Sequence, residues 1–167
     1  MKFLPYEDFY ITTRLKPDEV QQRLEDEISP VNGGLFKFGS FSSPSGTYFE
    51  GFAVNGMFEI KHGINYRNSF LPQIKGTTEA YLDGSRVHIK MKMLTFVTLF
   101  MCFWLSFAAL AGVVVLITAI NKKQFSAVAL MPFVMFLFGY ALTMGGFKYE
   151  SRSAKNKLLE ILDGEIE

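Results

Sequence analysis

The sequence predicts a membrane protein of the α+β class: an antiparallel, strongly curled or barrel-like β-sheet with covering helices, interrupted by a transmembrane hairpin of two helices. Two stretches contain no charged residue, Leu94–Ile120 and Phe125–Phe147. Each exceeds the length of about 20 apolar residues that crosses a bilayer. The segment before them alternates apolar and polar side chains, as half-buried strands do, and a polar helical segment follows them. These three observations predict the fold class.

An extended run and a helix come first in the chain. Phe9, Ile11 and Thr13 share one face of a predicted strand. A helix is expected over residues 17–28, because Pro17 suits a first helical turn and the acidic residues after it favour the positive end of the helix dipole. Its apolar residues recur at i, i+4 and i+8 and predict a face that packs on the sheet. They are Val20, Leu24 and Ile28.

Period-two patterns predict the strands of the sheet between Gly34 and Met93. Residues 47–54 and 57–62 form two strands joined by Asn55-Gly56, a pair typical of a tight hairpin turn. Asp83-Gly84 is expected to turn the chain into the strand "SRVHIKMKM". The other predicted strands cover residues 34–41, 64–72 and 78–82.

Only Asn121–Gln124 separates the two apolar stretches, so they are expected to form an antiparallel hairpin whose outer ends emerge on one side. Two buried helices of a soluble protein are the alternative, but the rest of the chain is too small to enclose helices of this length. Basic residues are more numerous at the outer ends than in the loop. The positive-inside rule therefore places both termini in the cytoplasm.

The chain after the hairpin is expected to return to the first domain. "FKYE", residues 147–150, alternates like a short strand, and residues 151–164 have the pattern of a helix with Ala154 and Leu158 on its apolar side. The hairpin is thus inserted into one domain. The predicted boundaries are 1–93 for the cytoplasmic β-rich domain, 94–120 for the first membrane helix, 121–124 for the outside loop, 125–147 for the second membrane helix, and 148–167 for the strand and helix that complete the domain.

Small residues within the hairpin indicate where helices approach each other, since they allow close packing in lipid. A pair four apart occurs in each stretch, Ala108 with Gly112 in the first and Ala141 with Gly145 in the second, and Gly139 lies near the second pair. These residues are expected to contact either the other helix of the same chain or a second copy of the protein. Neither stretch contains an ionisable Asp, Glu, Lys, Arg or His, which argues against an ion pathway through one hairpin.

The strand before the hairpin is striped with bases. Its apolar residues face the core, while Arg86, His88, Lys90 and Lys92 face the other way. Together with Lys148 and Arg152 beyond the second stretch, this row suits contact with anionic lipid at the membrane surface. The alternative is a pocket for a phosphorylated small molecule or nucleotide. The candidate ligand-binding residues are Arg67, Asn68, Arg86, His88 and Lys90.

The segment "YRNSFLP", Tyr66–Pro72, sets four hydrogen-bonding side chains before an apolar pair and a proline. With these residues and a later glycine, most of the chain resembles an uncharacterised group of bacterial proteins with a two-span hairpin and a small β-rich domain. That group supplies no residue roles, but it implies a bacterial inner membrane. In architecture the chain is also similar to the transmembrane β-barrel effectors of bacterial cyclic-oligonucleotide antiphage systems.

No pattern of catalysis is found, so a non-enzymatic protein is expected. The two histidines, His62 and His88, have no metal-ligand spacing, and no nucleotide-binding or nucleophile motif occurs. No cofactor is predicted, and the net charge of +1 does not favour a nucleic-acid polymer as a partner. The function predicted is sensing or binding of an anionic ligand or lipid at the membrane face. The alternatives are an antiphage effector that oligomerises on a cyclic nucleotide and disrupts the membrane, and an assembly partner of another membrane protein.

Overall fold

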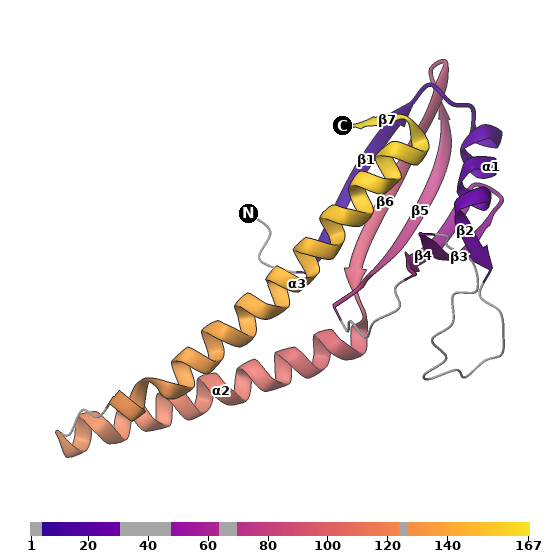
Figure 1. Cartoon of the computed structure of the whole chain (residues 1–167). Helices are drawn as coiled ribbons and strands as arrows, with labels where there is room; N and C mark the ends of the chain where they lie inside the picture. Colours follow the sequence, from indigo (N-terminus) through magenta and orange to yellow (C-terminus); the bar gives the residue numbers. More distant parts are fainter. Residues whose placement is uncertain (1–4, 31–47, 64–69, 124–126) are drawn as a thin grey trace.

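The protein has a β-sheet domain from which a long helical hairpin projects (Figure 1). The computed structural model describes residues 5–30, 48–63, 70–123 and 127–167. The helices are α1 (Pro17–Glu27), α2 (Thr95–Lys122), the short 3₁₀ helix η1 (Ala127–Leu130) and α3 (Met131–Leu162). The strands are β1 (Tyr6–Thr13), β2 (Ile28–Pro30), β3 (Phe49–Val54), β4 (Met57–His62), β5 (Pro72–Tyr81), β6 (Gly84–Met93) and β7 (Gly164–Ile166).

Within the described residues the strands form one sheet in the order β2-β3-β4-β5-β6-β1-β7. β2 and β7 are its end strands there, so this sheet is open and does not close as a barrel. The expectation of a fully antiparallel sheet is corrected at one place, because β2 pairs with β3 in parallel. A parallel pair requires a connection of about a dozen residues or more, and residues 31–48 supply that length.

Of the two predicted turns, the first is confirmed and the second is shifted by one residue. Asn55 and Gly56 join β3 to β4 with φ angles of 52° and 74°, as a primed hairpin turn requires. The turn from β5 to β6 consists of Leu82 and Asp83 instead of Asp83-Gly84, since Tyr81 pairs with Gly84. Gly84 is needed for a different reason: a Cβ there would overlap the carbonyl oxygen of Thr13. The predicted strand 34–41 and most of 64–72 lie outside the described residues.

One face of the sheet carries the hydrophobic core, and α1 and the second half of α3 cover it (Figure 1). The inward side chains of β1 and β6 follow the predicted alternation, and Val20 and Leu24 of α1 form the predicted helical stripe. Ile28, predicted as the third residue of that stripe, begins β2 instead, because α1 ends at Glu27. Almost no solvent reaches the largest of these side chains. They are Phe49, Phe147, Ile11, Leu24, Ile60, Ile74, Ile89, Met91, Leu158 and Leu162.

α3 is one continuous helix from the end of the hairpin to the edge of the sheet, and this overturns the predicted strand at 147–150. The four residues alternate in polarity, but the buried positions Phe147, Glu150 and Ser151, followed by Ala154 and Leu158, recur every three or four residues. The short strand follows the helix instead, as β7, after the helix ends at Leu162 with Asp163 in a left-handed conformation.

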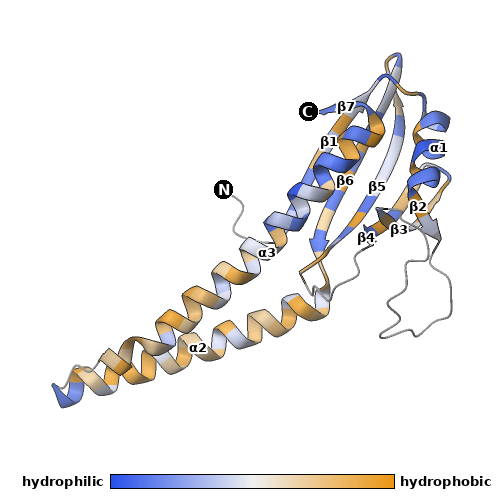
Figure 2. Cartoon of the chain, in the orientation of Figure 1, coloured by the Kyte–Doolittle hydropathy of each residue, from blue (hydrophilic) through white to orange (hydrophobic). Residues whose placement is uncertain are grey.

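The hairpin of α2 and α3 has two helices that are long and apolar enough to cross a membrane. In the most apolar windows only 11% and 17% of the residues are buried inside the protein. Figure 2 shows apolar residues along most of its length, with polar ones at the loop and where α3 meets the sheet. A helix at the core of a soluble protein would have most of its apolar side chains buried, so these apolar segments are not part of the core of this domain, which α3 joins only from Phe147 onward.

Proline at Tyr149 tests the continuity of α3. The Tyr149 side chain is 76% exposed, so Tyr149→Pro mainly affects the backbone, which loses a helical hydrogen bond and should destabilise the protein by about 3 kcal/mol. The measurement is the urea concentration at the midpoint of unfolding, monitored by circular dichroism of the full chain in detergent. Tyr149→Ala is the control and should change little. Equal midpoints for the two variants would contradict a continuous helix.

Candidate functional site

The outward face of β6 and its neighbours forms the candidate site. Val87, Ile89, Met91 and Met93 are buried, and the four basic side chains of the strand lie on the opposite, open face, as the sequence predicts. On that face the register sets Arg86 opposite Thr12, His88 opposite Tyr10, Lys90 opposite Asp8 and Lys92 opposite Tyr6. The partners of each base, which the sequence does not give, decide what each can bind.

Arg86 is committed to partners within the protein. Its guanidinium lies over the Tyr10 ring at 4.2 Å and the Tyr81 ring at 5.4 Å, and its Nη2 is 2.7 Å from a carboxylate oxygen of Glu167. The Nε atom is buried and has no hydrogen-bond partner within the described part of the chain. A phosphate that binds Nη2 of this side chain would have to compete with Glu167.

His88 is engaged in the same way. Its Nε2 lies 2.6 Å from Oδ1 of Asp8, and its ring stacks on Tyr10 with the centroids 4.3 Å apart. The Tyr6 hydroxyl donates a 2.7 Å hydrogen bond to the other oxygen of Asp8. This hydrogen bond, followed by the contact with His88, lowers the pKa of Asp8, and the same bond raises the pKa of Tyr6. The cluster therefore keeps Asp8 ionised and Tyr6 protonated.

Lys90 and Lys92 are the bases of β6 that remain available. Both are exposed, and neither forms an ion pair with another described residue. Two other lysines of the same sheet face differ, because each has a carboxylate on the neighbouring strand. These pairs are Lys61 with Glu50 at 3.2 Å and Lys75 with Glu59 at 2.7 Å. The free positive charge on this face is thus concentrated where β6 leads into α2.

Two more predicted bases flank the same end of the domain, on α3. Lys148 and Arg152 are both exposed. Lys148 lines a cavity of about 300 Å³ between the start of β1 and α3, together with Lys155, which pairs with Glu7 at 3.3 Å and lies over the Phe9 ring. The cavity contains as many carboxylates as amines, so it is not a strongly cationic pocket. Arg67 and Asn68, the remaining predicted ligand residues, lie outside the described residues.

The predicted small residues divide into two groups. Ala108 and Gly112 are buried between α2 and α3, and Gly112 faces the ring of Phe133. Gly139 lies beside Leu105 of α2. Ala141 and Gly145 are exposed, and no atom lies within 4 Å of a Cβ built at Gly145. They do not pack on α2, because the helices diverge as α3 approaches the sheet (Figure 1).

A buried polar cluster at the junction of α3 and the sheet escaped the sequence analysis. Glu150 of α3 is only 3% exposed, and its carboxylate lies 3.3 Å from Nδ1 of His62 at the end of β4. Tyr48 stacks on the His62 ring with the centroids 4.2 Å apart, and its hydroxyl is 2.8 Å from that of Ser153. The sequence does contain a signal for this cluster. If residues 147–158 are taken as one helix, Glu150 falls on the same face as the apolar residues of that helix and is expected to be buried.

No protein-family model, curated protein or solved structure matches this chain. The described residues also contain no group of three or more His, Cys, Asp or Glu side chains that could hold a metal ion. The interpretation of the site therefore depends on its own geometry.

The ionised Asp8 carboxylate should make the free energy of unfolding fall as the pH is lowered into the acid range. Because folding lowers the pKa of Asp8 from its ordinary value of 3.8, its contribution is present above pH 3.8 and is lost as the pH falls through the lower folded value. Asp8→Asn should therefore lose less stability than the wild type over this range. Urea midpoints measured against pH test this, with Asp83→Asn as the control for removing an exposed carboxylate. Parallel curves for Asp8→Asn and wild type would contradict it.

The pair of His62 and Glu150 should behave as a coupled unit. Replacing either residue with Leu removes this contact at a largely buried junction, at a cost of about 1–3 kcal/mol. The double variant should cost less than the sum, because the contact between the two side chains is lost only once. Urea unfolding of the four proteins of this cycle measures the coupling. Simple additivity would mean that the two side chains do not stabilise each other.

Proposed function

We propose that the protein is an integral protein of the bacterial inner membrane, with the α2–α3 hairpin across the bilayer and both termini in the cytoplasm. The exposed apolar surface of the hairpin supports insertion, since exposed apolar patches on soluble proteins rarely exceed a few hundred Å². Both outer ends of the hairpin connect to the same sheet: β6 leads directly into α2, and the end of α3 packs on the core. This supports a location of the whole domain on one side of the membrane. The bases around these ends favour the cytoplasmic side.

The lengths of the helices support this arrangement. At 1.5 Å per residue, the charge-free part of α2 is about 39 Å long and that of α3, Met131–Phe147, about 26 Å, or about 34 Å with the four 3₁₀ residues of η1 at about 2 Å each, against a hydrocarbon core of about 30 Å. The longer helix fits by tilting, which agrees with the divergence of the helices toward the domain. Lys92 and Lys148 then lie near the same membrane surface, each just outside an apolar segment.

We further propose that the domain binds anionic lipid headgroups at this surface and has no catalytic role. The observation that carries this proposal is the pair Lys90 and Lys92, exposed and without ion pairs in the described structure, at the end of β6 that adjoins α2. Lys148 and Arg152 extend the basic surface from the other side of the hairpin. A soluble phosphorylated ligand on this strand is less well supported, because Arg86 and His88 are already paired.

Neutralising Lys90 and Lys92 should reduce the preference of the protein for anionic lipid. With the full chain in phosphatidylcholine bilayers, spin-labelled phosphatidylglycerol should associate more strongly than spin-labelled phosphatidylcholine. Each lysine near the membrane surface contributes about 1 kcal/mol to the binding of an anionic headgroup beside it. Lys90→Gln combined with Lys92→Gln should therefore lower the ratio of the two association constants toward one. Added salt should have the same effect in the wild type, because it screens the attraction.

Lys61→Gln combined with Lys75→Gln is the matched control. It removes the same charge from the same sheet face, but from lysines that already pair with Glu50 and Glu59. It should leave the lipid ratio close to that of the wild type. If both double variants lower the ratio equally, overall charge explains the preference and the proposed site is wrong.

A further inference from the structure

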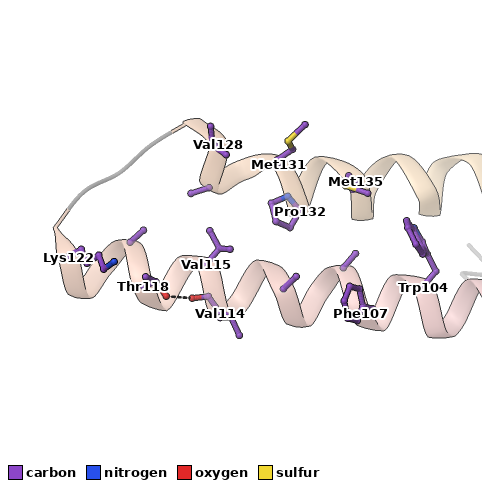
Figure 3. Close-up of a pocket in the computed structure, with 14 residues that line it drawn as sticks. Trp104, Phe107, Val114, Val115, Thr118, Lys122, Val128, Met131, Pro132 and Met135 are labelled. Atoms are coloured by element: carbon purple, nitrogen blue, oxygen red, sulfur yellow. Dashed lines mark hydrogen bonds between the residues drawn. The ribbon is translucent and has the colours of Figure 1, made fainter.

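A groove between the two hairpin helices lies at the end away from the sheet (Figure 3). Its volume is about 630 Å³. The space exists because several lining residues have small side chains: Ala108, Ala111 and Ala119 on α2 and Ala129 on η1. In Figure 3 the side chains of Val115 and Pro132 point into it from opposite helices.

The groove is apolar except at one end. Among the described residues that line it, Lys122 carries the only charge, and it lies at the end of α2 beside the loop. Of the described lining residues, only Thr118 has a hydroxyl group, and it already donates a 2.8 Å hydrogen bond to the carbonyl of Val114 (Figure 3). An occupant would therefore meet hydrocarbon along the groove and a cation at its mouth.

The groove is long and shallow. It extends along α2 from Trp104 to Lys122, about 27 Å at 1.5 Å per residue. A single extended hydrocarbon chain can lie along its whole length, whereas a transmembrane helix of a second copy, about 10 Å across, could place only side chains in it. The cation at the mouth also favours a lipid, because it complements an anionic headgroup and has no partner on an apolar helix.

We propose that this groove holds one acyl chain of an anionic phospholipid, whose phosphate pairs with Lys122. The inference depends on insertion of the hairpin in the membrane, but not on the basic surface of the sheet domain, which lies at the other end of the hairpin. A chain anchored at Lys122 and extended along the groove runs toward Trp104, and its methyl end is the part that comes nearest to the indole ring. The binding of this lipid fills the space that the alanines leave between the helices.

The only tryptophan of the chain, Trp104, lines the inner end of the groove and reports on its occupant. The probe is phosphatidylglycerol brominated near the methyl end of its acyl chains, added to the full-length protein in non-ionic detergent at low mole fraction. Bromine quenches tryptophan fluorescence on close approach. We expect quenching that saturates, as binding at one site requires.

Two variants test the groove and its mouth. Ala111→Phe fills the groove and should abolish the saturable quenching, while Ala141→Phe makes the same change on an exposed face of α3 and should leave it intact. Lys122→Gln should raise the lipid fraction needed for half-quenching about fivefold, the effect of one lysine near a charged headgroup. The neighbouring Lys123→Gln, outside the groove lining, should change it less. Circular dichroism checks that every variant keeps its helices.

Quenching that rises linearly with the lipid fraction, equally in all variants, would overturn the proposal. Saturable quenching that does not respond to Lys122→Gln would overturn the assignment of the headgroup. Either result is distinct from a failure of the proposed surface on the sheet, because Lys90→Gln combined with Lys92→Gln should not affect quenching at Trp104.

Discussion

The continuity of α3 is the constraint on which the rest of the structure depends. One helix forms half of the apolar hairpin and then, without a break, covers the sheet through Phe147, Ala154 and Leu158. The direction in which it leaves the sheet is therefore fixed by the packing of the core. The same packing sets the level of the sheet relative to the apolar segment, and so decides which side chains of β1 and β6 lie next to the end of the hairpin.

Pairing between neighbouring strands determines which charges on the open face remain available. Arg86 and His88 lie on either side of the Tyr10 ring, and each has a carboxylate partner that holds it in place. This arrangement rigidifies the far half of the strand. Lys90 and Lys92 form no ion pair with another described residue, although Lys90 lies opposite Asp8 and its charge helps to lower the pKa of that carboxyl group. The first half of the strand thus stabilises the sheet, and the second presents exposed charge.

The sequence was sufficient for the features that depend on periodicity over many residues, such as the two long apolar helices, the alternation of β6 and the stripe of α1. It was not sufficient where a pattern was short. Residues 147–150 fit a strand or a helix equally well, and only the buried positions up to Leu158 distinguish them. Nor could it identify cross-strand partners: Glu167 and Arg86 are far apart in the chain, and nothing local indicates their ion pair. The predicted contribution of Arg67 and Asn68 lies outside the described residues and stays a prediction.

The two connections between hairpin and sheet are unequal in stiffness. At α3, any change in angle requires breaking helical hydrogen bonds or separating buried groups, including the pair of Glu150 and His62. At α2, the strand β6 ends at Met93 and the helix begins at Thr95, so Leu94 alone joins them, with an extended backbone and a half-exposed side chain. Near this connection, among the described residues of α2, only Val97 packs against the hydrophobic core. The connection at α2 is therefore held by fewer core contacts than the one at α3, and the position of α2 depends mainly on its packing against α3, as at Gly112 and Phe133.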